Sequence, residues 1–190
     1  MRALGMLLYY AGLSYEKAGM FSGASYEAVC EWYHKGKELF EESIEKKRRK
    51  WIAVDEKEIK INGVTIFIWG AVDIDDEKVL AVWVSFGRSG LEAKAFFKKV
   101  RDTCKGRLPR IFIGGSWYHW ALRVVGFKRY TVMTFGPRSA IERLFSDIER
   151  RIRQFWNGFI GKFSRESMER WVKAFVGFRN CTKDLKRVLS

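Results

Sequence analysis

Two carboxylates have the residue type and the spacing that phosphoryl-transfer chemistry would need. Asp55 ends the short apolar run 51–54, and Glu142 lies one turn into a helix expected from about Ser139 to Phe155. Carboxylate oxygens are the ligands that Mg²⁺ prefers, and two such ions about 3.5–4 Å apart support phosphoryl transfer. A lone Asp at a strand end is more often a capping or solvated group. The hypothesis therefore depends on whether the fold joins the two residues.

The segments around these carboxylates show clear periodicity. Asn62-Gly63 is a strong hairpin signal between two strand-like runs. The expected elements, in order, are a strand over 51–55, a run over 58–61 and a strand over 64–74 on either side of the Asn62-Gly63 turn, a strand over 79–86, a helix over 91–104, a strand over 110–113, a helix over 117–125, a strand over 128–133 and the helix that carries Glu142.

This order predicts an α/β fold with a mixed five-stranded sheet, in which three antiparallel strands precede strand–helix units. It is the ribonuclease-H-like order, which brings the end of the first strand and the last helix to one edge. We assign residues 51–160 to this domain. Residues 161–190 contain a helix expected to pack on the sheet through an apolar face made of Met168, Trp171, Val172, Phe175 and Val176.

Residues 1–45 have a helical pattern. Ser14 and Ser25 can cap two short helices separated by the turn Ser22-Gly23-Ala24. This spacing suits a DNA-reading helix-turn-helix, and a plain helical packing module is the alternative.

The charge indicates a polyanionic partner. Lys and Arg total 36 against 22 Asp and Glu, a formal net charge of +14. The basic linker 46–50 should form a flexible arm, and arginines cluster around the Glu142 helix. Phosphates attract such groups, although a solvated basic face is the alternative reading. The candidate DNA-binding residues are Lys46, Lys47, Arg48, Arg49, Lys50, Arg138, Arg143, Arg150 and Arg151.

Other classes of protein are excluded by composition. No run of about 18 apolar residues predicts a membrane span, and the first residues do not resemble a secretory signal. Cys30, Cys104 and Cys181 form no metal-binding spacing and are expected to be reduced core thiols. We expect a cytoplasmic, nucleoid-associated protein. Two histidines, His34 and His119, cannot build a histidine-rich metal site.

Five blocks of residues together resemble the DDE transposases of prokaryotic insertion sequences, in particular the short archaeal type with an N-terminal helix-turn-helix. The blocks are Val54-Asp55-Glu56, Trp69 to Asp75, Gly87-Arg88-Ser89-Gly90, Gly114 to Leu122 and Thr134 to Arg143. The resemblance spans essentially the whole chain. It implies Mg²⁺-dependent or Mn²⁺-dependent cutting and joining of DNA, with Asp55 and Glu142 as catalytic metal ligands, and a homo-oligomer such as a dimer.

One departure from the family bears on catalysis. The family has its second catalytic Asp where this chain has Ile113. An isoleucine cannot coordinate a cation, so the resemblance implies weak Mg²⁺ binding and impaired activity. Asp73 is the nearest candidate for a substitute ligand.

Further departures affect the helix-turn-helix. Gly19, Ser22 and Ala24 replace larger residues of the family, and a helical glycine costs about 1 kcal/mol relative to alanine. Glu27 and Glu31 put negative charge on the expected reading helix. Together these changes predict relaxed constraint on DNA reading.

The leading hypothesis is therefore a DNA-binding protein of transposase descent with impaired catalysis. The alternatives are an active transposase with a substitute metal ligand, and an interaction protein that forms mixed oligomers with intact relatives and inhibits them. Trp117, Tyr118 and Trp120 could stack on bases, but their helical spacing with Ala121 and Val124 favours core packing.

Overall fold

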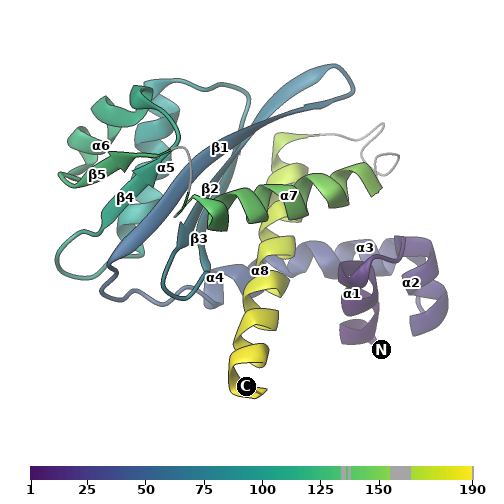
Figure 1. Ribbon diagram of the computed structural model, residues 1–190. Coiled ribbons are helices and arrows are strands. Elements are labelled where there is room, and N and C mark those ends of the chain that lie inside the picture. Colours follow the sequence, from purple (N-terminus) through teal and green to yellow (C-terminus); the bar gives the residue numbers. More distant parts are fainter. Residues whose placement is uncertain (134–135, 137, 155–163, 190) are drawn as a thin grey trace. The chain divides into compact units, whose positions relative to one another are not determined.

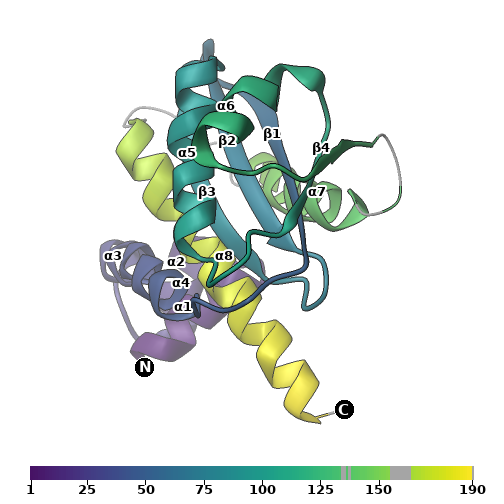
Figure 2. The same ribbon diagram turned by 90° about the vertical axis from the view of Figure 1, so that its left-hand side faces the viewer.

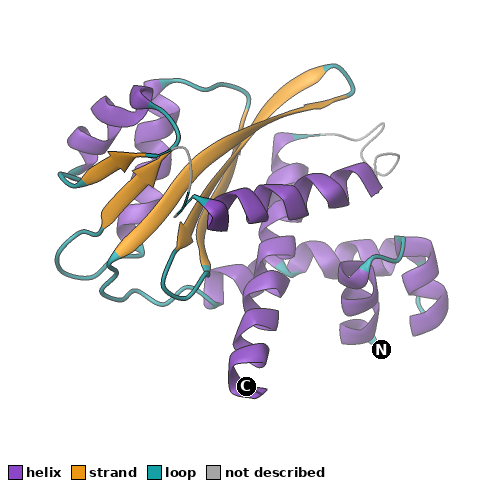
Figure 3. Cartoon of the chain, viewed as in Figure 1, coloured by secondary structure: helices purple, strands orange, loops and turns teal. Residues whose placement is uncertain are grey.

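The computed structural model describes residues 1–133, 136, 138–154 and 164–189 of the chain (Figure 1). It contains two compact units: one is formed by Met1–Ser43 with Arg150–Ser190, and the other by Ile44–Glu149. The first unit is helical, whereas the second contains the sheet (Figure 3). The C-terminal helix, which the sequence analysis expected to pack on the sheet domain, belongs to the helical unit. The expected domain boundary at residues 160 and 161 lies outside the described residues.

The second unit is built on a mixed five-stranded sheet with the order β3-β2-β1-β4-β5. β1 pairs antiparallel with β2, β2 antiparallel with β3, and β1–β4 and β4–β5 are parallel, as the sequence predicts. The strands are β1 (Trp51–Ile61), β2 (Val64–Asp73), β3 (Val79–Ser85), β4 (Arg110–Ile113) and β5 (Tyr130–Val132).

The hairpin between β1 and β2 forms for a local reason. Asn62 and Gly63 both have positive φ, 52° and 78°, as a type I′ turn requires. The tight turn fixes the register from the Ile61–Val64 pair down to the Ile52–Asp73 pair. β1 is therefore one strand of 11 residues, and Asp55 lies within it rather than at its end.

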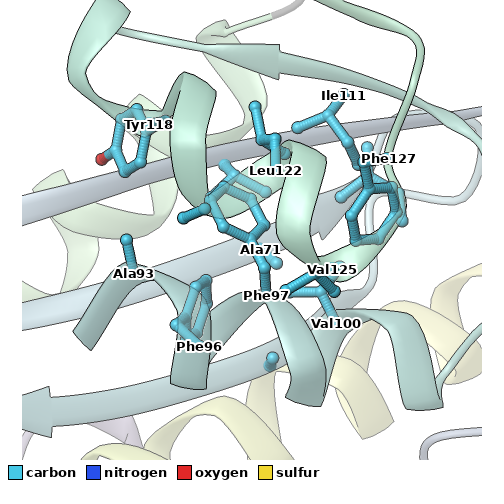
Figure 4. Close-up of a cluster of buried hydrophobic side chains, with 14 of the residues drawn as sticks. Ala71, Ala93, Phe96, Phe97, Val100, Ile111, Tyr118, Leu122, Val125 and Phe127 are labelled. Atoms are coloured by element: carbon cyan, nitrogen blue, oxygen red, sulfur yellow. The ribbon is translucent and has the colours of Figure 1, made fainter. Parts of the chain in front are cut away.

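Helices α5 (Gly90–Asp102) and α6 (His119–Val125) cover one face of the sheet, and α7 (Ser139–Gln154) begins against the other (Figure 2). On the α5 and α6 face, Phe96, Phe97, Leu122 and other apolar side chains form a buried core (Figure 4). On the α7 face, a Cβ at Gly70 would lie 2.8 Å from Ile141 Cδ1. Gly70 therefore allows α7 to lie directly on β2.

The buried face of α6 differs from the one that the sequence predicts. Ala121, Leu122 and Val125 are buried, whereas Trp120 and Val124 are about half exposed. The short 3₁₀ turn Ser116–Tyr118 before α6 rotates the helix relative to a continuous helical pattern from residue 117. The predicted core role is therefore wrong for Trp120 and Val124.

Five helices lie wholly within the first unit among the described residues, and the end of α7 from Arg150 also belongs to it. They are α1 (Arg2–Ala11), α2 (Tyr15–Ser22), α3 (Tyr26–Lys35), α4 (Lys37–Glu42) and α8 (Arg165–Leu189). Ser14 caps α2 and Ser25 caps α3, each accepting a hydrogen bond from a backbone N–H three residues later, as predicted. The expected apolar face of α8 is buried throughout, from Met168 to Val176.

The small residues of α2 have a packing role. A Cβ at Gly19 would lie 2.6 Å from the Ala24 carbonyl oxygen, and Ser22 is buried with its hydroxyl donating to the Ala18 carbonyl at 2.7 Å. A Cβ at Gly5 would lie only 3.0 Å from Ser22 Oγ. These residues let α1, α2 and the start of α3 approach closely, so their small size reflects close packing rather than a loosened seam.

The three cysteines are free thiols, and Cys104 is buried as expected. Cys30 and Cys181 are intermediate in exposure, so the expected core position is wrong for these two. Across the described part of the chain, we find no helix that combines the length and apolar character needed to cross a membrane.

Candidate functional site

Asp55 lies in β1 opposite Gly70 of β2 and points to the α7 face of the sheet. Its carboxylate forms an ion pair with the guanidinium of Arg138, which directly precedes α7. Both side chains are 15% exposed. Arg138 also donates from Nη1 to the Met133 carbonyl at 3.2 Å. Asp55 is therefore engaged by a protein cation that belongs to the start of α7.

The residue that faces Asp55 is Gly114, which directly follows β4. A Cβ built there would lie 2.8 Å from Asp55 Oδ1 and 2.9 Å from Arg138 Nη2. The parallel register agrees, because Val54 pairs with Ile113, and Asp55 and Gly114 are the residues that follow these two in the chain. The absence of a side chain at Gly114 leaves the room that the ion pair occupies.

Ile113 lies on the other face of the sheet. It is fully buried in the same apolar core as Val54 and Ile111, under α5 and α6. Adjacent residues of a strand point to opposite faces, so an Ile113 side chain and the Asp55 carboxylate lie on opposite sides. A carboxylate at residue 113 would enter the core of this structure rather than face Asp55.

Glu142 lies in the first turn of α7 with its side chain exposed. Its backbone N–H donates to the Arg138 carbonyl at 3.0 Å, which places Glu142 one turn beyond Arg138 on the same helix face. Arg138 is thus the residue that connects the two expected ligands. Within the described ranges, no three His, Cys, Asp or Glu side chains are grouped as a metal would require.

Asp73, the proposed substitute ligand, serves a different purpose. It is buried and forms an ion pair of 2.6 Å with Arg49, whose Nε also donates to the Thr103 carbonyl. Asp73 pairs with Ile52, so it faces the α5 side of the sheet, away from Asp55. The structure gives no support to a site shared by Asp55 and Asp73.

The residues present therefore do not fit the two-metal arrangement that this fold type implies. A guanidinium neutralises Asp55, Gly114 after β4 has no side chain, and Asp73 is on the other face of the sheet, paired with Arg49. Mg²⁺ at Asp55 would have to displace Arg138 and would gain too few oxygen ligands from the described side chains.

Glu56 is a titratable residue of the first motif block, and the sequence analysis assigned no function to it. Its side chain is 7% exposed and lies 3.3 Å from Arg88. Burial, and next the neighbouring Asp55 charge, raise the pKa of Glu56 to about 7, with Arg88 acting in the opposite direction. The guanidinium of Arg88 lies over the rings of Phe67 and Trp117, 5.7 and 5.8 Å from their centroids.

The motif blocks around this carboxylate thus have structural roles. Ser89 and Glu92 form a reciprocal capping box at the start of α5. Tyr118 is fully buried and stacks with Trp117, which agrees with the expected core packing of these two rings. In the last block, Thr134, Phe135 and Pro137 lie outside the described residues.

The basic linker is anchored rather than free. Lys47 forms a 2.6 Å ion pair with Asp76, and its carbonyl accepts from Lys105 N. Arg49 is buried against Asp73. The expectation of a flexible arm is wrong at these two positions, since alternate residues point inward. Lys46, Arg48 and Lys50 are exposed.

The arginines near Glu142 likewise include both buried and exposed side chains. Arg151 is 5% exposed, donates to the Tyr9 carbonyl and lies 5.4 Å from the Tyr9 ring centroid. The prediction that Arg151 contacts DNA is therefore contradicted by its burial. Arg143 is exposed and pairs with Glu77, Arg150 is exposed, and Arg138 is held by Asp55.

Sequence reasoning missed an aromatic and basic surface at the start of β1 and β4. Trp51 is 38% exposed, and its ring stacks on Phe112 with a centroid distance of 5.7 Å. The Arg110 guanidinium lies 5.7 Å from the Trp51 centroid, and Arg110 N donates to the Lys50 carbonyl. The signal was present, because Lys50 directly precedes β1 and Arg110 is the first residue of β4, but only the strand register brings them together.

Comparison with known proteins identifies a relative by sequence and solved structures with a similar fold. No family model matches the sequence. The uncharacterized protein MJ0017 of Methanocaldococcus jannaschii is 36% identical over 189 residues, covering 97% of this chain and 87% of the relative.

Among solved structures, a chain of the simian T-cell lymphotropic virus intasome in complex with PP2A regulatory subunit B56 gamma superposes with a TM-score of 0.52 at 11% identity. The match covers 67% of this chain and 48% of that chain, so this chain spans about half of its length. The catalytic core domain of BIV integrase gives a TM-score of 0.45 at 12% identity, over 63% of this chain and 80% of the core. The sheet unit therefore has a ribonuclease-H-like fold.

Proposed function

The chain belongs to the same family as MJ0017 of M. jannaschii, and on that premise we propose that it is a DNA-binding protein of insertion-sequence transposase descent that no longer cuts DNA. The insertion-sequence origin, of the short archaeal type, comes from the sequence resemblance. The ribonuclease-H-like fold supports it. The proposal includes association with the nucleoid and a homo-oligomer, as the resemblance implies.

The observation that carries the loss of cutting is the state of Asp55. In place of a second carboxylate, Gly114 after β4 faces Asp55, and in place of a free ligand, Asp55 is bound by Arg138. DNA binding itself needs no metal, because basic side chains that neutralise phosphates release counterions and gain affinity.

DNA contact is proposed at the surface formed by Arg48, Lys50, Arg110 and Trp51, which we call the strand-entry surface. Its cations can bind phosphates, and the exposed ring of Trp51 offers a stacking face for a base. Lys46 extends the same segment. The helix-turn-helix remains a second proposed contact, although Glu31 on α3 is exposed and pairs with Lys35 at 2.6 Å.

Fluorescence anisotropy on a short labelled duplex, in buffer with a metal chelator, tests the binding. The logarithm of the affinity should fall linearly with that of the salt concentration between about 50 and 200 mM. The double variant Arg48→Ala/Lys50→Ala should reduce the magnitude of this slope by about 2, one unit for each lost phosphate contact. The matched control is Lys98→Ala/Lys99→Ala, which removes two exposed charges from α5. Equal losses in both variants would contradict the proposed surface.

Nicking of a supercoiled plasmid with Mg²⁺ or Mn²⁺ tests the catalytic part. The native chain should be silent. Metal-dependent nicking that Asp55→Ala abolishes would instead establish the alternative of an active transposase.

A further inference from the structure

We propose that Arg138 takes the place of a divalent cation in this protein, and that residue 114, rather than residue 113, is the position from which a carboxylate could complete a metal site with Asp55. The inference extends the proposed function, since it gives a physical reason for the loss of cutting. Its test measures cation binding, which is independent of DNA binding.

The first step concerns charge. Asp55 and Arg138 are each only 15% exposed, so their charges lie largely away from water and compensate each other. Removal of one partner from such a pair leaves the other without compensation. Arg138 supplies one fixed positive charge at the site where this fold type otherwise relies on metal ions. The Asp55 carboxylate therefore needs no cation from solution.

The second step concerns space. Arg138 Nη2 lies 2.9 Å from the point where a Cβ of residue 114 would be, so the guanidinium and a side chain at 114 compete for one volume. Gly114 and Arg138 are in this sense a matched pair. The atoms that crowd residue 114 are the ends of two flexible side chains, Asp55 Oδ1 and Arg138 Nη2, rather than backbone. A larger residue at 114 can be accommodated once Arg138 is shortened.

The third step concerns the face of the sheet. Ile113 is fully buried among the apolar residues under α5 and α6, beside Val54. An aspartate there would be an unpaired charge in a core, on the far side of the sheet from Asp55. Restoring the family's acidic residue at position 113 should therefore destabilise the protein without building a metal site.

Manganese titration followed by electron paramagnetic resonance measures the binding directly, because the signal of free Mn²⁺ is lost on coordination. In the native chain, Asp55→Asn should leave Mn²⁺ binding unchanged. Arg138→Ala alone should strengthen it, and Asp55→Asn in that background should remove the gain. Gly114→Asp/Arg138→Ala should bind at least about 10-fold more tightly than Arg138→Ala.

The control is Ile113→Asp/Arg138→Ala, which adds the same carboxylate one residue earlier and should gain no Asp55-dependent site. Far-UV circular dichroism shows which variants fold. Two results would overturn the inference irrespective of the redesigned proteins: a native Mn²⁺ site that Asp55→Asn destroys, or an Arg138→Ala protein that binds no better than the native chain. Equal binding by the 113 and 114 variants, or a folded Gly114→Asp/Arg138→Ala protein without a new site, would overturn the assignment of residue 114.

Discussion

Gly19 lies inside α2, where helix propensity alone would favour alanine by about 1 kcal/mol. The structure reverses that expectation, because an alanine Cβ would lie 2.6 Å from the Ala24 carbonyl oxygen. A backbone atom cannot move aside as a side chain can. We expect Gly19→Ala to lower the free energy of unfolding by about 1–3 kcal/mol, measured by thermal unfolding. Lys17→Ala, on the exposed side of α2, should stay within about 0.5 kcal/mol. A stabilised Gly19→Ala protein would revive the view that this glycine reflects relaxed constraint.

Glu56 gives a prediction about pH at the same scale. Burial and the Asp55 charge raise the pKa of Glu56 in the folded protein from 4.5 to about 7. As pH rises, the unfolded chain therefore releases this proton first and binds fewer protons than the folded chain, so stability falls between these two pKa values.

We expect Glu56→Gln to reduce this loss of stability with rising pH. Urea unfolding at pH values below 4.5 and above about 7 measures the difference. Glu58→Gln, an exposed position on the same strand, should leave the fall in place. A native chain that gains stability with pH over this window would contradict the prediction.

At the scale of elements, the sequence predicted the features that depend on residues close together in the chain. The Asn62-Gly63 turn depends on two positive φ angles, and the caps Ser14 and Ser25 depend on contacts three residues away. The strand order followed from the succession of such elements. These features are encoded in short stretches of chain, so a single sequence is enough to find them.

The site itself was only partly predictable, because its contacts join distant segments. Asp55 was identified, but its partner Arg138 lies 83 residues later in the chain. The face on which Ile113 lies depends on its register with Val54, which no local pattern shows. The run Lys46–Lys50 reads as uniform charge, and only the fold distinguishes its inward from its outward positions.

Arg48 and Arg49 make that distinction measurable. Arg49 and Asp73 are 2% and 3% exposed in their side chains and 2.6 Å apart. Arg49→Ala leaves a buried carboxylate without its partner and should lower the free energy of unfolding by about 3–5 kcal/mol. Arg48→Ala should change stability by less than about 0.5 kcal/mol and act on DNA affinity instead. Chemical unfolding and anisotropy of both variants provide the test, and equal stability losses would contradict it.

At the scale of the whole molecule, closeness in sequence does not decide which elements form a unit. The first 43 residues share a unit with residues 150–190, from the far end of the chain. Phe178 of α8 stacks with Tyr33 of α3 at 5.5 Å and with Tyr10 of α1 at 5.3 Å. Trp171 donates from Nε1 to the Tyr9 hydroxyl at 2.9 Å. The N-terminal helices therefore depend on α8 for their core.

This dependence predicts a reciprocal pattern in native-state hydrogen exchange. Phe178→Ala removes a ring from the helical unit and should cost about 3–5 kcal/mol, which corresponds to at least about 100-fold faster exchange of the protected amides in α3. The β1 amides should change little. Phe97→Ala, in the core under α5, should have the opposite pattern. If each unit opens separately, the two variants act on separate sets of amides. If both variants accelerate α3 and β1 equally, the chain unfolds as one cooperative body, and an N-terminal substitution would then weaken the Asp55 site as well.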